Sequence, residues 1–335
     1  MSLFGQSLLA DTDLKAAEID AVYALATKLK SGADSSRYLQ GKHLALVLEK
    51  TSTRTRIAFE VAIKRQGGFS TTLEYATSQL GLRESIADTA AVLSRVYDVI
   101  AYRGTRHVDL VNLQAHATKP VVNALTDMWH PTQALADYFT MQEVKKTSWR
   151  DIAIAYVGDG RNNVAHSLLT TGAILGADVR IASPESLQPD LGIEAMSLEL
   201  AEVSGAKVLV TDDPIEAVLG ADFVYTDVWV SMGEALDAWN ERISLLRDFQ
   251  VNQELLTATK NPNVRFMHCL PAIHDRNTDI GEQIASNYGY DNGVEVTDEV
   301  FQSKASVVFD QAENRLHTIE ALLVLLASDT YGKTL

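Results

Sequence analysis

Short β-branched and aliphatic runs alternate with amphipathic helical patterns along the whole chain, and this alternation constrains the fold more than any other feature. The run HLALVL at 43–48 and the run IAIAYV at 152–157 are the clearest examples. Strands that alternate with helices are typical of parallel sheets with helices on their faces. We therefore expect an α/β fold built from parallel sheets flanked by helices.

The same patterns predict where the individual elements lie. Strands are expected at 43–48, 98–102, 120–124, 152–157, 178–182, 207–211, 222–226, 264–268 and 306–309. Helices are expected at 13–30, 53–66, 84–96, 107–117, 132–144, 163–175, 193–204, 214–219, 240–247, 278–287 and 312–328.

The length of the chain predicts two domains, because 335 residues exceed what one hydrophobic core usually holds. The polar stretch EVKKTSWRD at 143–151 precedes a new strand and marks the boundary. We expect a first domain of residues 1–147 and a second of residues 148–311. The last helix follows the final strand of the second half, so residues 312–335 are expected to pack back on the first domain.

Charge and cysteine content exclude several classes of partner. The net charge of −15 disfavours nonspecific binding to nucleic acids or anionic membranes. The single cysteine, Cys269, excludes an intrachain disulfide and fits a reducing compartment. The amino terminus lacks a secretory pattern, and the longest apolar run, 321–327, is far shorter than the ~20 residues that cross a bilayer. A cytoplasmic protein is expected.

An anion-binding motif follows the first strand, where Ser52-Thr53-Arg54-Thr55-Arg56 opens a helical pattern. Hydroxyls, a guanidinium and the first backbone N–H groups of a helix all donate hydrogen bonds, and the helix dipole favours negative charge there. The plain alternative is a helix cap with two solvated arginines. Two arginines placed between hydroxyls favour the anion site.

Two further signals lie in the first half. His130-Pro131-Thr132-Gln133 opens a helix, with Gln133 about one turn from His130, so an imidazole and an amide can hold a carbonyl and an NH2 group. Arg103 follows a predicted strand and precedes Gly104, which leaves space for a ligand. Taken alone, such a histidine is more often structural and an arginine after a strand is common, so only their combination favours a site.

The turn Gly158-Asp159-Gly160-Arg161-Asn162-Asn163 follows a strand and at first resembles a dinucleotide-binding turn. Asn163 stands where the third glycine belongs, and the next strand ends in Ser183-Pro184 without a ribose-binding acid. Asn162 and Asn163 can instead bind a carboxylate.

Three more strand ends carry candidate residues. Asp227 and Ser231 lie four residues apart and suit an ammonium group, although either could be a helix cap. Cys269 follows His268, and this pair is too small a ligand set for zinc, so no metal is expected. Arg315 in the first turn of the last helix opposes the helix dipole and needs another partner, such as a substrate oxygen.

In this order, the motifs resemble the aspartate/ornithine carbamoyltransferase family over nearly the whole chain. The segments STRTR at 52–56 and HPTQ at 130–133 resemble the shared carbamoyl phosphate motifs. The segments DVWVSMG at 227–233 and HCLP at 268–271 resemble the ornithine branch, in its bacterial form. The resemblance implies transfer of the carbamoyl group of carbamoyl phosphate to the side-chain amine of L-ornithine. The products would be L-citrulline and phosphate, in arginine synthesis or the arginine deiminase pathway, without a cofactor.

The resemblance also implies roles for single residues. Phosphate would be held by Ser52, Thr53, Arg54 and Thr55, with Arg103 and His130 at the carbonyl oxygen. The carbamoyl NH2 group would be bound by Gln133 and the carbonyl of Leu270, with Cys269 and Arg315 completing the site. Ornithine would be bound by Asn163, Asp227, Ser231 and Met232. Arg103, His130, Cys269 and Arg315 are the expected catalytic residues.

The family further implies a homotrimer or a multiple of trimers, in which Gln79 reaches a neighbouring active site. Arg83 follows that segment, and its role stays open. Two other functions remain to be tested: a carbamoyltransferase for another amine, such as putrescine or an acylated ornithine, and a dinucleotide-binding protein built on 158–163.

Overall fold

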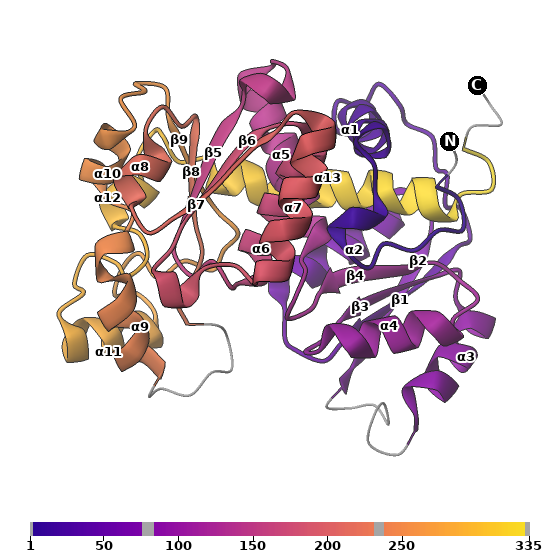
Figure 1. The fold of residues 1–335 in the computed structure, drawn as a ribbon. Coiled ribbons are helices and arrows are strands. Elements are labelled where there is room, and N and C mark those ends of the chain that lie inside the picture. The colour runs from indigo at the N-terminus through magenta and orange to yellow at the C-terminus, as the bar shows by residue number, and fades with distance from the viewer. Residues whose placement is uncertain (1–2, 76–83, 231–237, 332–335) are drawn as a thin grey trace. The chain divides into compact units, whose positions relative to one another are not determined.

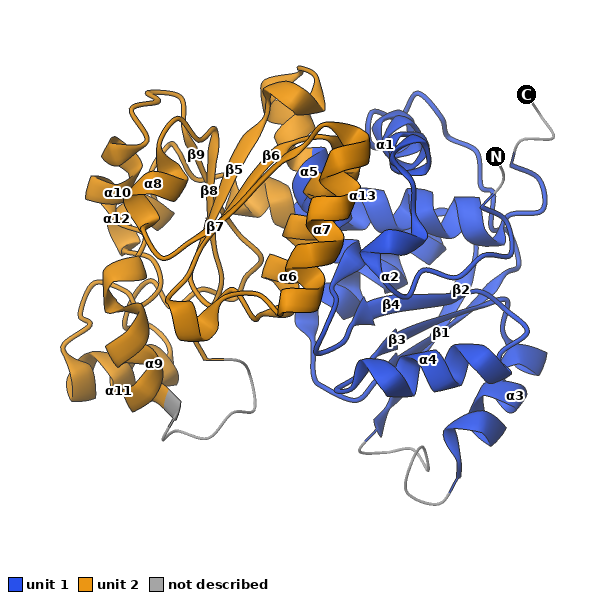
Figure 2. Cartoon of the chain, viewed as in Figure 1, with its two compact units in different colours: residues 1–139, 313–335 blue, residues 140–312 orange. Residues whose placement is uncertain are grey.

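The structure is a computed structural model that describes residues 3–75, 84–230 and 238–331. The chain divides into two compact units (Figure 2). Unit 1 comprises Met1–Phe139 and Glu313–Leu335, and unit 2 comprises Thr140–Ala312. Each unit contains a parallel sheet flanked by helices (Figure 1), which confirms the predicted fold class.

Within the described residues, unit 1 has a four-stranded sheet in the order β2-β1-β3-β4. Its strands are β1 (His43–Leu48), β2 (Phe69–Glu74), β3 (Val99–Arg103) and β4 (Val121–Leu125). Its helices are α1 (Ala16–Lys30), α2 (Thr53–Arg65), α3 (Ile86–Val96) and α4 (His107–His116), together with most of α5 (Pro131–Lys145) and α13 (Val308–Ala327). Leu48 pairs with Arg103, so β1 and β3 end at the same edge of the sheet. This register brings the start of α2 beside Arg103.

The strand β2 was missed by the sequence prediction. Among the described strands it pairs only with β1, at the edge of the sheet, from Phe69 opposite His43 to Glu74 opposite Leu48. Its sequence FSTTLE is mostly polar, and none of its residues is fully buried. An edge strand of this composition lacks the apolar run by which the other strands were recognised.

The C-terminal helix α13 packs in unit 1, as predicted. Buried Gln66 at the end of α2 donates from Nε2 to Glu320 Oε1 at 2.8 Å, and Lys30 of α1 donates to Asn314 Oδ1 at 2.8 Å. The predicted strand at 306–309 is wrong, because Val308 already begins α13 and Ser306 makes a single bridge to Phe266. The run SVVF has strand propensity, but helix packing overrides it.

Within the described residues, unit 2 has a five-stranded parallel sheet in the order β7-β6-β5-β8-β9. Its strands are β5 (Ala153–Val157), β6 (Asp178–Ala182), β7 (Lys207–Thr211), β8 (Phe223–Thr226) and β9 (Arg265–His268). Its helices are α6 (Asn163–Leu175), α7 (Leu191–Ser204), α8 (Pro214–Val218), α9 (Ala238–Leu246), α10 (Gln253–Ala258), α11 (Asp279–Tyr288) and α12 (Asp298–Phe301). Short 3-10 turns lie at Asp11–Asp13, Trp149–Asp151, Glu185–Leu187 and Arg247–Phe249.

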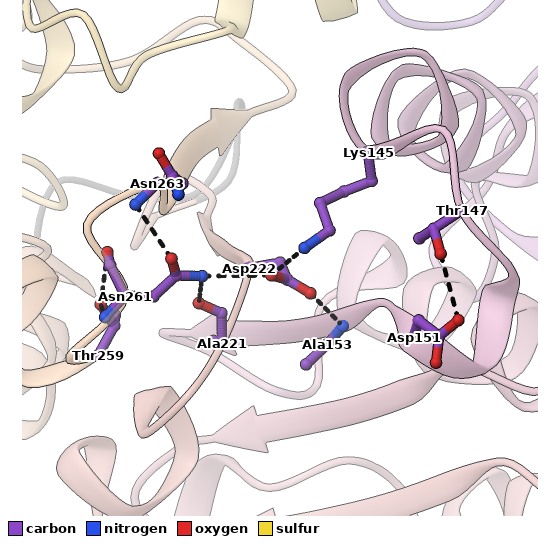
Figure 3. A network of polar contacts seen from close by, with 9 residues as sticks. All are labelled: Lys145, Thr147, Asp151, Ala153, Ala221, Asp222, Thr259, Asn261 and Asn263. Atoms are coloured by element: carbon purple, nitrogen blue, oxygen red, sulfur yellow. Dashed lines mark hydrogen bonds and ion pairs between the residues drawn. The ribbon is translucent and has the colours of Figure 1, made fainter.

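A polar network holds the amino-terminal edge of this sheet together (Figure 3). Asp222, just before β8, accepts from Lys145 Nζ at 2.6 Å, from the backbone N–H of Ala153 at 3.1 Å and from Asn261 Nδ2 at 3.2 Å. These partners come from the end of α5, the start of β5 and the turn before β9. The network therefore lies opposite the carboxyl ends of the strands, where the predicted site residues of this unit are found. In the described ranges, no helix is both long and apolar enough to cross a membrane.

Candidate active site

The anion-binding motif is placed at the start of α2 in unit 1. Ser52 is the N-cap residue, and its hydroxyl accepts from the backbone N–H of Thr55 at 3.3 Å. The plain helix cap that the sequence left open is therefore present. The helix continues because Ala58, Phe59, Ala62 and Ile63 form a buried face at helical spacing.

Thr55 shows that the motif does more than cap a helix. Its side chain is fully buried, and Oγ1 accepts from Arg103 Nη1 at 3.1 Å and from Arg315 Nη2 at 3.1 Å. A hydroxyl has two acceptor positions and one proton, so two such bonds leave the Thr55 O–H to donate. The fold thus joins residues from α2, β3 and α13 at one oxygen atom.

Charge in this cluster favours a bound anion. Arg103 and Arg315 are both buried, with 6% and 3% of their surface exposed. Two guanidinium groups that meet at one hydroxyl repel each other, and they repel more strongly away from bulk water. A phosphate dianion would relieve this repulsion and accept hydrogen bonds from both arginines.

His130 lies in the same cluster. It precedes α5, is 4% exposed, and its backbone carbonyl accepts from the N–H groups of Gln133 and Ala134. Burial lowers the pKa of His130 well below its ordinary value, and the charges of Arg315, Arg103 and Arg54 lower it further. The imidazole is therefore neutral near pH 7 and can donate one hydrogen bond to a carbonyl oxygen.

Gln133 occupies the first turn of α5 and is buried. Its Nε2 donates to Asp137 Oδ1 at 2.8 Å. No hydrogen-bond partner for its Oε1 lies among the described residues. Asp137 was not singled out in the sequence, although it stands four residues after Gln133 on the same helix face.

In unit 2, a second cluster is centred on Asp227, directly after β8. One oxygen of this carboxylate, Oδ2, accepts from Asn162 Nδ2 at 2.7 Å. The other, Oδ1, accepts from Cys269 Sγ at 2.9 Å and from the backbone N–H of Val228 at 2.8 Å. Asp227 is 7% exposed, so these three neutral donors replace much of its hydration.

Asn162 connects this carboxylate to the helix α6. It is the N-cap residue of α6, and its Oδ1 accepts from the backbone N–H of Val164 at 2.7 Å. Asn163, the predicted carboxylate ligand, is the first residue of the helix. The turn thus fixes the positions of both asparagines relative to Asp227.

The turn that carries Cys269 and Leu270 is held by a buried histidine. The backbone N–H of Leu270 donates to His268 Nδ1 at 2.8 Å, and His268 Nε2 lies 3.3 Å from Glu295 Oε1. Glu295 also accepts from the N–H of Ile273 at 2.6 Å. Leu270 has a φ of 61°, which costs a non-glycine residue about 1 kcal/mol, so these bonds stabilise an unfavourable backbone.

Comparison with known proteins now gives the family. The carbamoyl-P binding domain of aspartate/ornithine carbamoyltransferase matches residues 6–143, and the Asp/Orn binding domain of the same family matches residues 150–326. The chain belongs to the aspartate/ornithine carbamoyltransferase family.

Similar proteins cover nearly the whole chain. A catabolic ornithine carbamoyltransferase from Rhizobium meliloti is 49% identical over 98% of this chain and 99% of its own. One from Burkholderia mallei, also named catabolic, is 50% identical over 96% and 97%. The solved ornithine carbamoyltransferase from Pyrococcus furiosus has a TM-score of 0.87 and 44% identity, covering 98% of both chains.

Membership of the carbamoyltransferase family decides against a dinucleotide-binding function for residues 158–163. The turn after β5 nevertheless has the glycine geometry that suggested such a function. Gly158 adopts a φ of 148°, and the N–H of Gly160 donates to Ser183 Oγ at 3.0 Å. Ser183 in turn donates to the carbonyl of Leu187 at 2.7 Å. The glycines therefore serve a tight connection from β5 to α6, and Ser183, directly after β6, stands where a ribose-binding acid would be.

The side chains Asp227, His268 and Cys269 bring three potential metal ligands within 4.8 Å of one another. Hydrogen bonds within the protein already use Nδ1 of His268, the thiol of Cys269 and both oxygens of Asp227, and His268 Nε2 lies 3.3 Å from Glu295 Oε1. We therefore assign no metal to this cluster of the carbamoyltransferase.

The remaining predicted residues are distributed as follows. Thr53 and Arg54 are the first two residues of α2, and the charge of Arg54 contributes to the lowered pKa of His130. Gln79, Arg83, Ser231 and Met232 lie outside the described residues. Glu295 was missed, because it stands far along the chain from His268 and no local pattern links the two.

Proposed function

We propose that this chain is an ornithine carbamoyltransferase that transfers the carbamoyl group of carbamoyl phosphate to the side-chain amine of L-ornithine, giving L-citrulline and phosphate. The observation that carries the proposal is the contact of buried Arg103 and Arg315 with one hydroxyl of Thr55, beside a neutral His130. Relatives that match nearly the whole chain bear the same name.

Residues 1–147 with 312–335 bind carbamoyl phosphate in this proposal. The phosphate is held by Ser52, Thr53, Arg54, Thr55 and Arg315. Arg103 spans the phosphate and the carbonyl oxygen, and His130 donates to that oxygen. Gln133 Oε1 and the backbone carbonyl of Leu270 accept from the NH2 group. This assignment is supported by the buried donors around Thr55.

Residues 148–311 bind ornithine. Asn163 holds the α-carboxylate, and Asp227, Ser231 and Met232 hold the α-amino end. Support comes from Asp227, whose buried carboxylate accepts from Asn162, Cys269 and the N–H of Val228, all neutral donors, and suits an ammonium group. Cys269, whose thiol donates to Asp227 Oδ1, contacts the reacting groups.

The chemistry is a direct attack of the amine on the carbamoyl carbon. Arg103, His130 and Thr55 stabilise the oxyanion of the tetrahedral intermediate through fixed donors. An amine of this kind has a pKa near ~10, so the neutral form must be bound or created before it attacks. The C–N bond forms, the C–O bond to phosphate breaks, and the departing phosphate takes the proton.

The assembly proposed for this chain is a homotrimer or a multiple of trimers, in which Gln79 contributes to a neighbouring active site. The proposed location is the cytoplasm, and the names of the Rhizobium and Burkholderia relatives favour a catabolic role. Sedimentation equilibrium tests the first point: a mass that is not a multiple of three chains would contradict it.

An assay with a panel of amines tests the function. Purified protein with carbamoyl phosphate should form citrulline and phosphate in equal amounts from ornithine, and less than about 1% of that rate is expected with putrescine or N-acetylornithine, which lack groups that the site binds. Faster turnover of either alternative amine would reassign the acceptor.

A further inference from the structure

The hydrogen bond between Gln133 and Asp137 leaves the side-chain oxygen of Gln133 as a hydrogen-bond acceptor. Both residues lie on the same face of α5, and both are buried, with 1% and 0% of their surface exposed. Gln133 Nε2 donates to Asp137 Oδ1 at 2.8 Å, while Gln133 Oε1 has no hydrogen-bond partner among the described residues.

The chemistry of the two side chains fixes which end of the amide faces Asp137. An ionised carboxylate accepts hydrogen bonds and cannot donate, so it binds the NH2 end of an amide and repels the oxygen. An amide is otherwise nearly symmetric in shape and can turn over without a steric cost. Asp137 therefore sets the direction of the Gln133 amide.

The consequence concerns the cluster around Thr55, in which the arginines only donate and the neutral His130 keeps a single acceptor nitrogen. Arg54, Arg103 and Arg315 have no acceptor atom, and Thr55 Oγ1 already accepts twice. The Gln133 oxygen is thus an acceptor placed in the part of the protein that binds the donor substrate. A carbamoyl group has both a carbonyl oxygen and an NH2 group, and only the NH2 group can satisfy this oxygen.

We infer that Asp137 is a positioning residue that orients the Gln133 amide and thereby makes the site select a carbamoyl group over acyl groups of the same shape. The inference rests on the proposed binding of carbamoyl phosphate to unit 1. Acetyl phosphate is the matched probe, because it replaces NH2 by CH3 and leaves the rest of the molecule unchanged. Its methyl group leaves the Gln133 oxygen unsatisfied.

The first test is Asp137→Asn, which keeps the size of the side chain. An asparagine can either donate or accept, so the amide of Gln133 is no longer held in one direction. We expect carbamoyl phosphate to bind about tenfold more weakly, as for a lost hydrogen bond in a buried site, while acetyl phosphate binds about as before. Calorimetric titration gives both dissociation constants. An unchanged ratio between them would overturn the inference.

The second test exchanges the two partners. In Asp137→Asn/Gln133→Glu the asparagine donates to the glutamate, and a glutamate oxygen again faces the carbamoyl NH2 group. The formal charge of the pair is unchanged. We expect the double variant to recover most of the preference for carbamoyl over acetyl phosphate that Asp137→Asn loses. A purely structural role for Asp137 predicts no recovery.

Gln133→Glu alone keeps Asp137 and supplies the test if Asp137→Asn fails to fold. Two carboxylates 2.8 Å apart cannot both stay ionised, so the pair binds one proton between them. Carbamoyl phosphate should then bind more tightly as the pH falls. The same pH dependence of affinity in this variant and in the wild type would contradict the inference.

Gln133→Met separates this inference from the proposed function. If it leaves the affinity for carbamoyl phosphate unchanged, the proposed contact of Gln133 is wrong. If it weakens binding while Asp137→Asn does not, the contact stands and only the role of Asp137 fails.

Discussion

The two clusters have opposite electrostatic designs. In unit 1, cationic side chains donate to a neutral hydroxyl, and the neighbouring histidine is neutral because burial and those cations lower its pKa. In unit 2, neutral donors surround one buried carboxylate, Asp227. A positive cluster suits a phosphate dianion, and a negative one suits an ammonium group. In our proposal each half of the chain therefore recognises one charge, and changes in each half should affect different substrates.

The largest effect is expected in unit 1. Arg103→Met removes a buried cation that donates to Thr55 and, in our proposal, to the oxyanion. We expect kcat/KM for carbamoyl phosphate to fall about 10³-fold, the scale of a lost oxyanion donor. Steady-state kinetics at saturating ornithine measures this. Arg106→Met, at an exposed pair with Asp109, is the matched control and should stay near wild type. Near-normal activity of Arg103→Met would refute its role.

A smaller and selective effect is expected in unit 2. Asp227→Asn removes the charge that we assign to the α-amino group, so kcat/KM for ornithine should fall about 10²-fold, as for a charged hydrogen bond lost in a buried site. The dissociation constant of carbamoyl phosphate should stay within about twofold, because our proposal gives Asp227 no direct contact with that substrate. Equal weakening of both substrates would break the comparison between the two units.

Cys269→Ser tests whether the thiol is a contact or a nucleophile. A serine can still donate to Asp227, so we expect a loss of about tenfold in kcat, the scale of one altered hydrogen bond. Loss of all activity, together with a covalent carbamoyl adduct of the wild type detected by mass spectrometry, would show a nucleophile instead.

The smallest expected effect is that of His130 on the pH dependence of the free energy of unfolding. Because the pKa of His130 is lowered in the folded protein, the unfolded chain takes up a proton near pH 6.5 that the folded protein does not. Stability is therefore present above that pH and is lost as the pH falls. Between pH 6.5 and 5, the free energy of unfolding of His130→Gln should therefore fall by up to about 2 kcal/mol less than that of the wild type.

Urea denaturation of wild type and His130→Gln at both pH values measures this difference. The pKa of His107 and of His317 is also lowered by burial, so some pH dependence remains in the variant. An identical pH dependence in the two proteins would show that the pKa of His130 is not lowered in the folded state.

Much of the fold could be predicted because its strands are apolar and its loops carry the unusual residues. The alternation of strands and helices gave the parallel α/β architecture, and the motifs after β1, β3 and β8 lie where parallel strands end together. The edge strand β2 was missed because its residues are polar and partly exposed. The start of α13 was misassigned because SVVF has strand propensity.

The supporting residues of the site were harder to predict than the residues that they support. Asp137 is one acid among many in the sequence, and its importance appears only when its burial and its bond to Gln133 are known. Glu295 meets His268 through tertiary structure alone, since 26 residues separate them in the chain. Local patterns identify chemistry at strand ends, whereas the orientation of each group depends on contacts from distant segments.

The most direct test of the account is a calorimetric titration of carbamoyl phosphate into three proteins without ornithine: wild type, Arg103→Met and Asp227→Asn. We predict that Asp227→Asn binds as the wild type does, while Arg103→Met shows no binding in the same concentration range. Loss of binding in both variants, or in neither, would contradict the assignment of opposite charges to the two substrates.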